Sequence, residues 1–93
     1  MGRYELKVPG GKLLRAECRV EGRTIKKVKL SGDFFLHPEE SIAILEERLT
    51  GITAEKTEIE EIVKEFIKEG NIFIGLNPEH IVEAVLKAAQ KPE

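Results

Sequence analysis

This 93-residue sequence has few of the residues from which proteins build reactive sites. Its single cysteine, Cys18, excludes an internal disulfide and a metal site made of several cysteines. It has one methionine, no tryptophan and one aspartate, Asp33. No apolar run approaches the ~20 residues that span a bilayer, and the N-terminal residues lack the apolar segment of a signal peptide. We therefore expect a cytoplasmic protein with a single domain over residues 1–93.

The charged residues are unevenly distributed along the chain. Residues 1–32 carry nine Lys or Arg against three Glu, a net charge of +6, and residues 33–93 carry six against fourteen acids, a net charge of -8. Two readings stay open: the halves attract each other within one domain, or the basic half faces an anionic ligand or partner. Glu and Lys dominate the charges, which is typical of thermophilic proteins.

Alternating apolar and charged residues predict three strands in the first third of the chain. The apolar positions of the first two strands are Tyr4, Leu6, Val8, Leu14, Ala16, Cys18 and Val20. Glu21-Gly22 suits a tight hairpin, and residues 23–31 form the third strand. Ile25 is out of phase with Val28, which predicts either a bulge near Lys26-Lys27 or a strand end with two apolar sides.

Helical spacing begins after residue 37. Pro38 suits the first position of a helix, and Thr50-Gly51 suit its end. The apolar face of this helix is Ile42, Leu45 and Leu49. A second helix is expected over residues 54–69, ending at Gly70-Asn71. Its apolar stripe is Ile59, Ile62, Val63, Phe66 and Ile67.

A third helix has the clearest start. Asn77 suits the cap and Pro78 the first helical position, after an apolar connector at Ile72-Phe73-Ile74. Its buried positions are expected to be Ile81, Val82, Val85, Leu86 and Ala89. Strands followed by helices indicate the α+β class: a three-stranded antiparallel meander followed by three helices packed on one face.

Two segments are candidates for docking. The first, Pro9-Gly10-Gly11-Lys12, lacks the spacing of a phosphate-binding loop and joins two strands, which favours a plain hairpin turn. Lys12 at the tip of this turn could still reach a phosphate held by another protein. Gly32-Asp33-Phe34-Phe35 is the second segment. If the chain is extended there, one Phe enters the core and the other an interface; a folded loop would bury both. Neither segment offers a nucleophile–base pair, so we expect no catalytic residue.

Other candidate sites have plain structural readings. Cys18 is in phase with the apolar side of its strand, which favours core packing over a sulfur-carrier or iron–sulfur assembly role. His37 and His80 have no partners at metal-ligand spacing, so no metal site is expected. Tyr4 is the only aromatic residue in the basic strands and faces the apolar side, which disfavours a nucleic-acid-binding module.

Several short motifs follow one another along the chain. They are Lys7-Val-Pro-Gly-Gly-Lys-Leu-Leu14, Gly22, Lys29-Leu-Ser-Gly-Asp-Phe-Phe-Leu36, Pro38-Glu-Glu40, Leu45-Glu46 and Leu49-Thr-Gly51. In this order and spacing they resemble the C-terminal accessory domain of lipoate–protein ligases, over nearly the whole chain. The resemblance implies a small α+β fold similar to iron–sulfur scaffold and sulfur-acceptor proteins.

The resemblance also implies a division of labour. The family's catalytic domain carries an Arg-rich Gly-Gly-Gly loop ending in His-Asp and a substrate-contacting lysine, and this sequence shows neither. Because Met1 directly precedes the first expected strand, we expect a separately encoded subunit that is non-catalytic alone and binds no cofactor by itself.

Its implied partner is a ligase catalytic subunit, in a heterodimer that uses ATP, Mg²⁺ and lipoate to form lipoyl-AMP. The lipoyl group then passes to lipoyl-accepting carrier domains. The candidate contact or active-site lid residues are Pro9, Gly10, Gly11, Lys12, Gly32, Asp33, Phe34 and Phe35.

Overall fold

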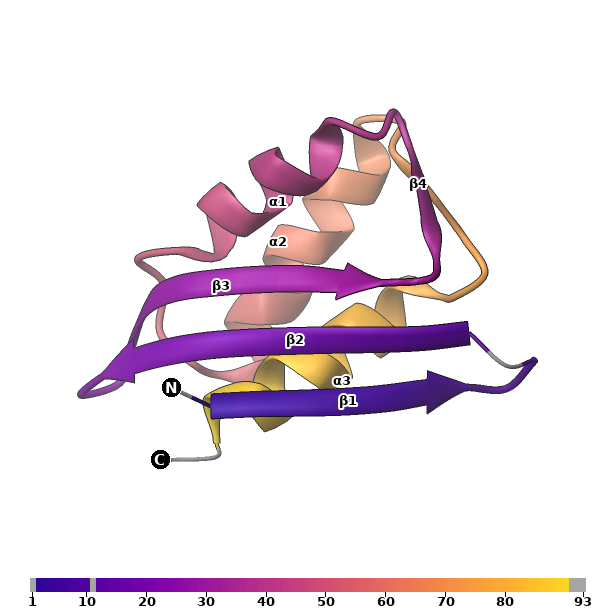
Figure 1. Ribbon diagram of the computed structural model, residues 1–93. Helices are drawn as coiled ribbons and strands as arrows, with labels where there is room; N and C mark the ends of the chain where they lie inside the picture. The colour runs from indigo at the N-terminus through magenta and orange to yellow at the C-terminus, as the bar shows by residue number, and fades with distance from the viewer. Residues whose placement is uncertain (1, 11, 91–93) are drawn as a thin grey trace.

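The computed structural model describes residues 2–10 and 12–90. These residues form a three-stranded antiparallel sheet in the order β1-β2-β3, a separate two-stranded ribbon of β4 and β5, and three helices (Figure 1). The elements are β1 (Gly2–Val8), β2 (Lys12–Glu21), β3 (Thr24–Gly32), β4 (Phe35–His37), α1 (Ser41–Leu49), α2 (Lys56–Lys68), β5 (Ile72–Ile74) and α3 (Pro78–Ala89). The predicted α+β class, with a meander followed by helices, is confirmed. None of the described helices has the length and apolarity to cross a bilayer.

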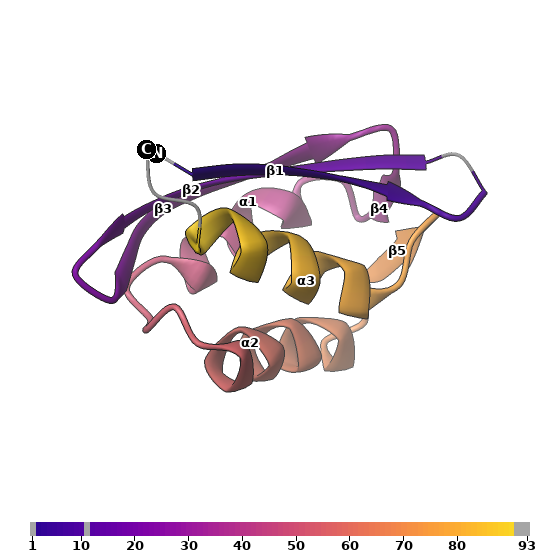
Figure 2. The ribbon, with the colours of Figure 1, turned by 90° about the horizontal axis from the view of Figure 1, so that it is seen from below.

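The helices cover one face of the three-stranded sheet (Figure 2). Helix α3 packs against β1 and β2 and helix α1 against β3, while α2 packs on α1 and α3 at a greater distance from the sheet. Ala84 and Ala88 are buried in α3, whereas Leu86 and Ala89, which we expected in the core, are only half-buried. Small residues on the buried face let a helix lie close to its neighbours, which explains why two alanines occupy these positions.

The strand register confirms the predicted bulge. Arg19 pairs with Lys27 and Val20 pairs with Ile25, which leaves Lys26 without a partner in β2. One extra residue reverses the facing of every residue beyond it, because side chains alternate along a strand. The bulge therefore turns Ile25 into the core, where it is fully buried beneath the sheet.

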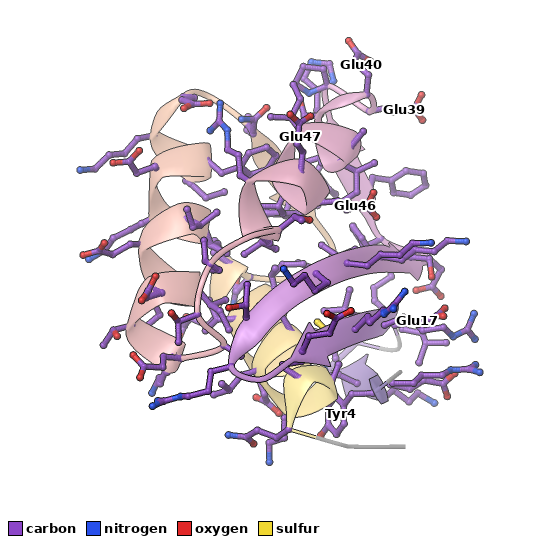
Figure 3. The ribbon with its side chains drawn as sticks, turned by 90° about the vertical axis from the view of Figure 1, so that its left-hand side faces the viewer. Tyr4, Glu17, Glu39, Glu40, Glu46 and Glu47 are labelled. Atoms are coloured by element: carbon purple, nitrogen blue, oxygen red, sulfur yellow. The ribbon has the colours of Figure 1, made fainter. Side chains whose placement is uncertain are left out.

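The outer edge of β3 is covered by polar contacts from the following segments. The Ile25 N–H donates to the Ile52 carbonyl at 2.9 Å. Glu46 points from α1 toward β3, and its carboxylate accepts a hydrogen bond from the Leu30 N–H at 2.7 Å (Figure 3). Hydrogen bonds of this kind make an edge strand less available for pairing with another chain.

Helix α1 begins later than the sequence predicts. It starts at Ser41, so the prediction that Pro38 is its first residue is wrong. Pro38 instead lies in a turn, where its carbonyl accepts a hydrogen bond from the Ser41 N–H at 3.1 Å. The reason is that His37 belongs to β4, and the chain needs this turn to pass from the strand into the helix.

The ends of the other helices follow the expected turn chemistry. Gly70 has a φ of +100° after α2, a conformation that glycine adopts without steric cost. Helix α3 begins at Pro78 after Asn77, as predicted. The imidazole Nδ1 of His80 accepts a hydrogen bond from the Asn77 N–H at 3.0 Å, so this histidine closes the helix start.

The ribbon of β4 and β5 was not predicted. The segment Ile72–Ile74, expected as a connector, pairs antiparallel with Phe35–His37. Each strand has only three residues, too few for a periodic signal. The strands are also far apart in the sequence, with α1 and α2 between them along the chain. Their pairing therefore depends on how these two helices pack.

Gly32 lies where β3 leaves the sheet. Its φ is +149°, and a Cβ at this position would overlap the carbonyl oxygen of Leu13 on the neighbouring strand. The backbone of β3 therefore passes closer to β2 than any residue with a side chain allows. Gly22, in the hairpin between β2 and β3, also has a positive φ of +64°, but nothing lies within 4 Å of its Cβ position.

We predict that Gly32→Ala lowers the free energy of unfolding by at least ~2 kcal/mol, because it adds a backbone clash to an unfavourable dihedral angle. Gly22→Ala, the matched control, should cost only about 1 kcal/mol, the dihedral term alone. Urea unfolding followed by circular dichroism measures both. Equal losses for the two variants would contradict the proposed close approach.

Cys18 lies in the core between the sheet and α3. Its side chain is buried, and its Sγ lies 3.8 Å from the Val85 carbonyl oxygen. Burial raises the pKa of the Cys18 thiol to about 11. Since the thiolate is the reactive form, both the pKa and the burial suppress reaction at neutral pH.

We predict that a thiol-reactive reagent at pH 8 labels native Cys18 on the order of 100-fold more slowly than an exposed cysteine. The rate should rise as pH increases toward the raised pKa, because the thiolate fraction grows. Labelling in denaturant is the control and should be complete and fast. Fast labelling of the folded protein would instead support a sulfur-carrier role.

Candidate functional site

The two segments singled out in the sequence lie side by side. The Asp33 N–H donates to the Leu13 carbonyl oxygen at 3.1 Å, and the Leu13 N–H donates to the Asp33 carboxylate. These reciprocal hydrogen bonds join the turn after β3 to the first residues of β2. The structure thus brings Lys12 next to the Gly32–Phe35 turn, whereas the position of Gly11 lies outside the described residues.

The adjacent phenylalanines point in opposite directions. Phe34 is half-buried, and its ring centroid lies 6.1 Å from that of Phe73, which in turn lies 5.9 Å from that of buried Phe66. Phe35 is 59% exposed. The loop does not bury both rings: Phe34 packs against the core and Phe35 is exposed, while a role of Phe35 in an interface stays a prediction.

Lys12 lies across the ribbon instead of extending into solvent. Its Cγ, Cδ and Cε lie 3.1–3.4 Å from the position that a Cβ on Gly75 would occupy. Its Nζ lies 5.7 Å from the centroid of the Phe35 ring, a cation–π distance. Gly75 is therefore a site residue that the sequence analysis missed, because no local pattern links it to a lysine in β2.

The outer side of the ribbon forms an apolar surface. Phe35 pairs with Ile74 and His37 with Ile72, so these four side chains share one face. We call them the ribbon face. The apolar members are exposed, by 59% for Phe35, 55% for Ile72 and 54% for Ile74. The run of three apolar residues at Ile72, Phe73 and Ile74 was the only hint in the sequence, and three residues are too few to reveal which of them face outward.

Shallow hollows flank the ribbon on both sides. One is lined by Phe35, Leu36, His37, Pro38, Glu39, Glu40 and Ile74. The other is lined by Val8, Pro9, Phe73, Ile74, Gly75, Leu76, Asn77 and His80. Pro9 therefore lies near Ile74, at the end of the ribbon. Glu39 and Glu40 lie just before α1 (Figure 3).

The basic strands are partly neutralised by their own glutamates. Glu5 accepts hydrogen bonds from Arg15 at 2.8 Å and Arg3 at 2.9 Å, and these arginines, Arg15 first, lower the pKa of the Glu5 carboxyl. Arg23 pairs with Glu55 at 2.7 Å and so links the basic half to the acidic half. Some of the basic charge is thus neutralised within the sheet, and one ion pair links the two halves.

The geometry of this surface suits binding. Its polar groups are a lysine placed on an aromatic ring, an exposed histidine and an aspartate engaged by the backbone. Among residues 2–10 and 12–90, no three His, Cys, Asp or Glu side chains are grouped as metal ligands would be. Cys18 lies away from this surface, under the sheet.

Known proteins are similar to this chain in sequence and fold. The chain matches the family model for the C-terminus of bacterial lipoate protein ligase over residues 3–85. It is 40% identical over 73 residues to the lipoate-protein ligase A subunit 2 of Thermoplasma acidophilum, a match that covers 78% of this chain and 76% of that protein.

A solved structure from an archaeal lipoylation system is also similar. That work concerns a bi-partite lipoate protein ligase and its E2 lipoyl domain from Thermoplasma acidophilum. The matched chain has a TM-score of 0.76 and 36% identity, with 90% of each chain covered. From the family match over most of its length, this chain belongs to the family of lipoate protein ligase C-terminal domains.

Proposed function

We propose that this chain is the accessory subunit of a two-protein lipoate–protein ligase. It joins a separate catalytic subunit, and the pair activates lipoate with ATP to lipoyl-AMP and transfers the lipoyl group to a carrier domain. The observation that carries the proposal is the 40% identity to a ligase subunit 2, of which this chain covers 76%. The cytoplasm is the compartment that we propose for this reaction.

The chemistry of the reaction explains why an accessory subunit is useful. A carboxylate–AMP anhydride hydrolyses in water, so its formation benefits from a surface that excludes solvent and holds flexible catalytic loops in place. ATP, Mg²⁺ and lipoate are substrates and cofactor of the complex, and this chain needs to bind none of them alone. Its contribution is a preorganised surface.

We place that surface at the Pro9–Lys12 hairpin and the Gly32–Phe35 turn. The reciprocal hydrogen bonds between Leu13 and Asp33 hold the two together. The Lys12 ammonium group is fixed over Phe35 and provides one positive charge that can offset the charge of a bound triphosphate. The alternatives have less support, since the buried thiol of Cys18 argues against sulfur transfer.

The test is reconstitution with the catalytic subunit. We predict that adding this chain raises lipoate-dependent exchange of pyrophosphate into ATP and lipoylation of the carrier domain. Lys12→Ala and Phe35→Ala should each lower exchange roughly 10-fold, because each removes one contact of the closed site.

Lys87→Ala is the matched control for Lys12. The Lys87 Nζ lies 6.0 Å from the ring centroid of Tyr4, a similar pair on a different part of the surface. It should leave exchange unchanged. If neither Lys12→Ala nor Phe35→Ala alters exchange or complex formation, the proposed contact surface is wrong.

A further inference from the structure

We infer that the ribbon face is the hydrophobic centre of the interface with the catalytic subunit, and that Lys12 is a charged group at its rim. This inference rests on the proposed function and specifies how the two subunits bind. The centre of the interface then lies on β4 and β5, and the two turns lie beside it.

Exposed apolar side chains are concentrated on this face. Among the described residues, the large hydrophobic side chains with high exposure are Phe35, Ile44, Ile72 and Ile74. Three of these four come from the ribbon, although β4 and β5 contribute only six residues together. Isolated exposed apolar residues are ordinary, but a cluster on one small face marks an interaction site.

Folding does not require these side chains to be apolar. Leu36 and Phe73 pair across the ribbon and point inward, and Leu36 is buried in the core. The inward pair therefore attaches the ribbon to the domain. Polar β-branched residues in place of Ile72 and Ile74 would keep the strand propensity without exposing apolar surface. The presence of two isoleucines here is therefore explained by a partner that covers them.

The ribbon is attached to the core and to β2 by contacts that need no partner. Phe34, Phe73 and Phe66 form a chain of ring contacts from the turn into the core. The hydrogen bonds between Asp33 and Leu13 hold the turn on its other side. A surface that is already ordered loses little conformational entropy on binding, which favours tight association for a small area.

Charged groups beside the ribbon define the chemistry of the occupant. Lys12 lies at the end formed by Phe35 and Ile74. Glu39 and Glu40 line a hollow that runs along β4 and also includes Phe35, His37 and Ile74. The complementary surface has an apolar centre, an acidic group facing Lys12 and a basic group facing the glutamates.

The catalytic subunit is the occupant that fits this surface. The ribbon face is continuous, through Pro9 and Lys12, with the surface proposed above for that subunit. The three apolar residues of the ribbon face are too few to form a stable interface alone, since such interfaces have roughly 20 residues on each side. The ribbon face is therefore the centre of a larger contact that includes both turns.

The two parts of the interface should control different rates. Buried apolar groups at the centre of an interface slow dissociation, whereas a charge at the rim changes the association rate and its dependence on salt. Loss of apolar side chains from the ribbon face should thus raise the dissociation rate constant. Loss of the Lys12 charge should weaken the salt dependence of association, in addition to lowering exchange as predicted above.

The test is the double variant Ile72→Thr/Ile74→Thr, measured by surface plasmon resonance against the immobilised catalytic subunit. Threonine keeps the β-branched side chain, so the thermal unfolding midpoint should be unchanged. We predict an increase in Kd of at least ~30-fold, mostly from faster dissociation. Lipoylation should return toward the wild-type rate when the variant is added at saturating concentration, because docking and not chemistry is impaired.

Leu86→Ala is the control for apolar surface elsewhere. Leu86 is half-buried in the groove between α2 and α3, toward the C-terminal end of α3. Its replacement should change Kd less than about 2-fold. Lys12→Met tests the rim: it should reduce the effect of salt on the association rate and leave dissociation nearly unchanged.

Distinct outcomes separate the inference from the proposed function. If the wild-type chain does not bind the catalytic subunit, both the proposed function and the inference are wrong. If the wild-type chain binds and supports lipoylation while the double variant binds with the same Kd, the proposed function stands and the inference is overturned. If the double variant instead converts a wild-type homodimer into a monomer without changing binding to the catalytic subunit, the ribbon face serves self-association and the inference is also overturned.

Discussion

The candidate surface depends on the close approach of Gly32 to Leu13. Because Gly32 has no side chain, β3 can leave the sheet against the backbone of β2, and Asp33 then exchanges hydrogen bonds with Leu13. This contact determines the direction in which the next residues run. It places Phe34 toward the core and Phe35 toward solvent beside Lys12.

The same contact lets a small domain have a stable core and an exposed apolar surface. The core lies between the sheet and the helices, and Phe73 and Leu36 connect the ribbon to it. The outward residues of the ribbon add nothing to that core. The chain belongs to the lipoate protein ligase C-terminal family, and its relative in Thermoplasma acidophilum is named as one subunit of a ligase.

Local features were predictable because they depend on nearby residues. The bulge at Lys26 follows from the phase of Ile25, and the start of α3 follows from Asn77 and Pro78. The start of α1 was misplaced at Pro38, because a proline suits both a first helical turn and a connecting turn. The choice between these depends on β4, whose partner strand lies beyond two helices.

By itself, the sequence determined the α+β class, the strands of the meander, the presence of the three helices, the start of α3 and the ends of α1 and α2, since periodicity and turn residues encode these over short distances. It also singled out the two candidate docking segments. Only the tertiary structure decided that they meet, that Lys12 lies over Gly75, and that Ile72 and Ile74 join Phe35 on one face. These contacts link residues far apart in the chain, and their geometry is set by the packing of α1, α2 and the sheet around a common core.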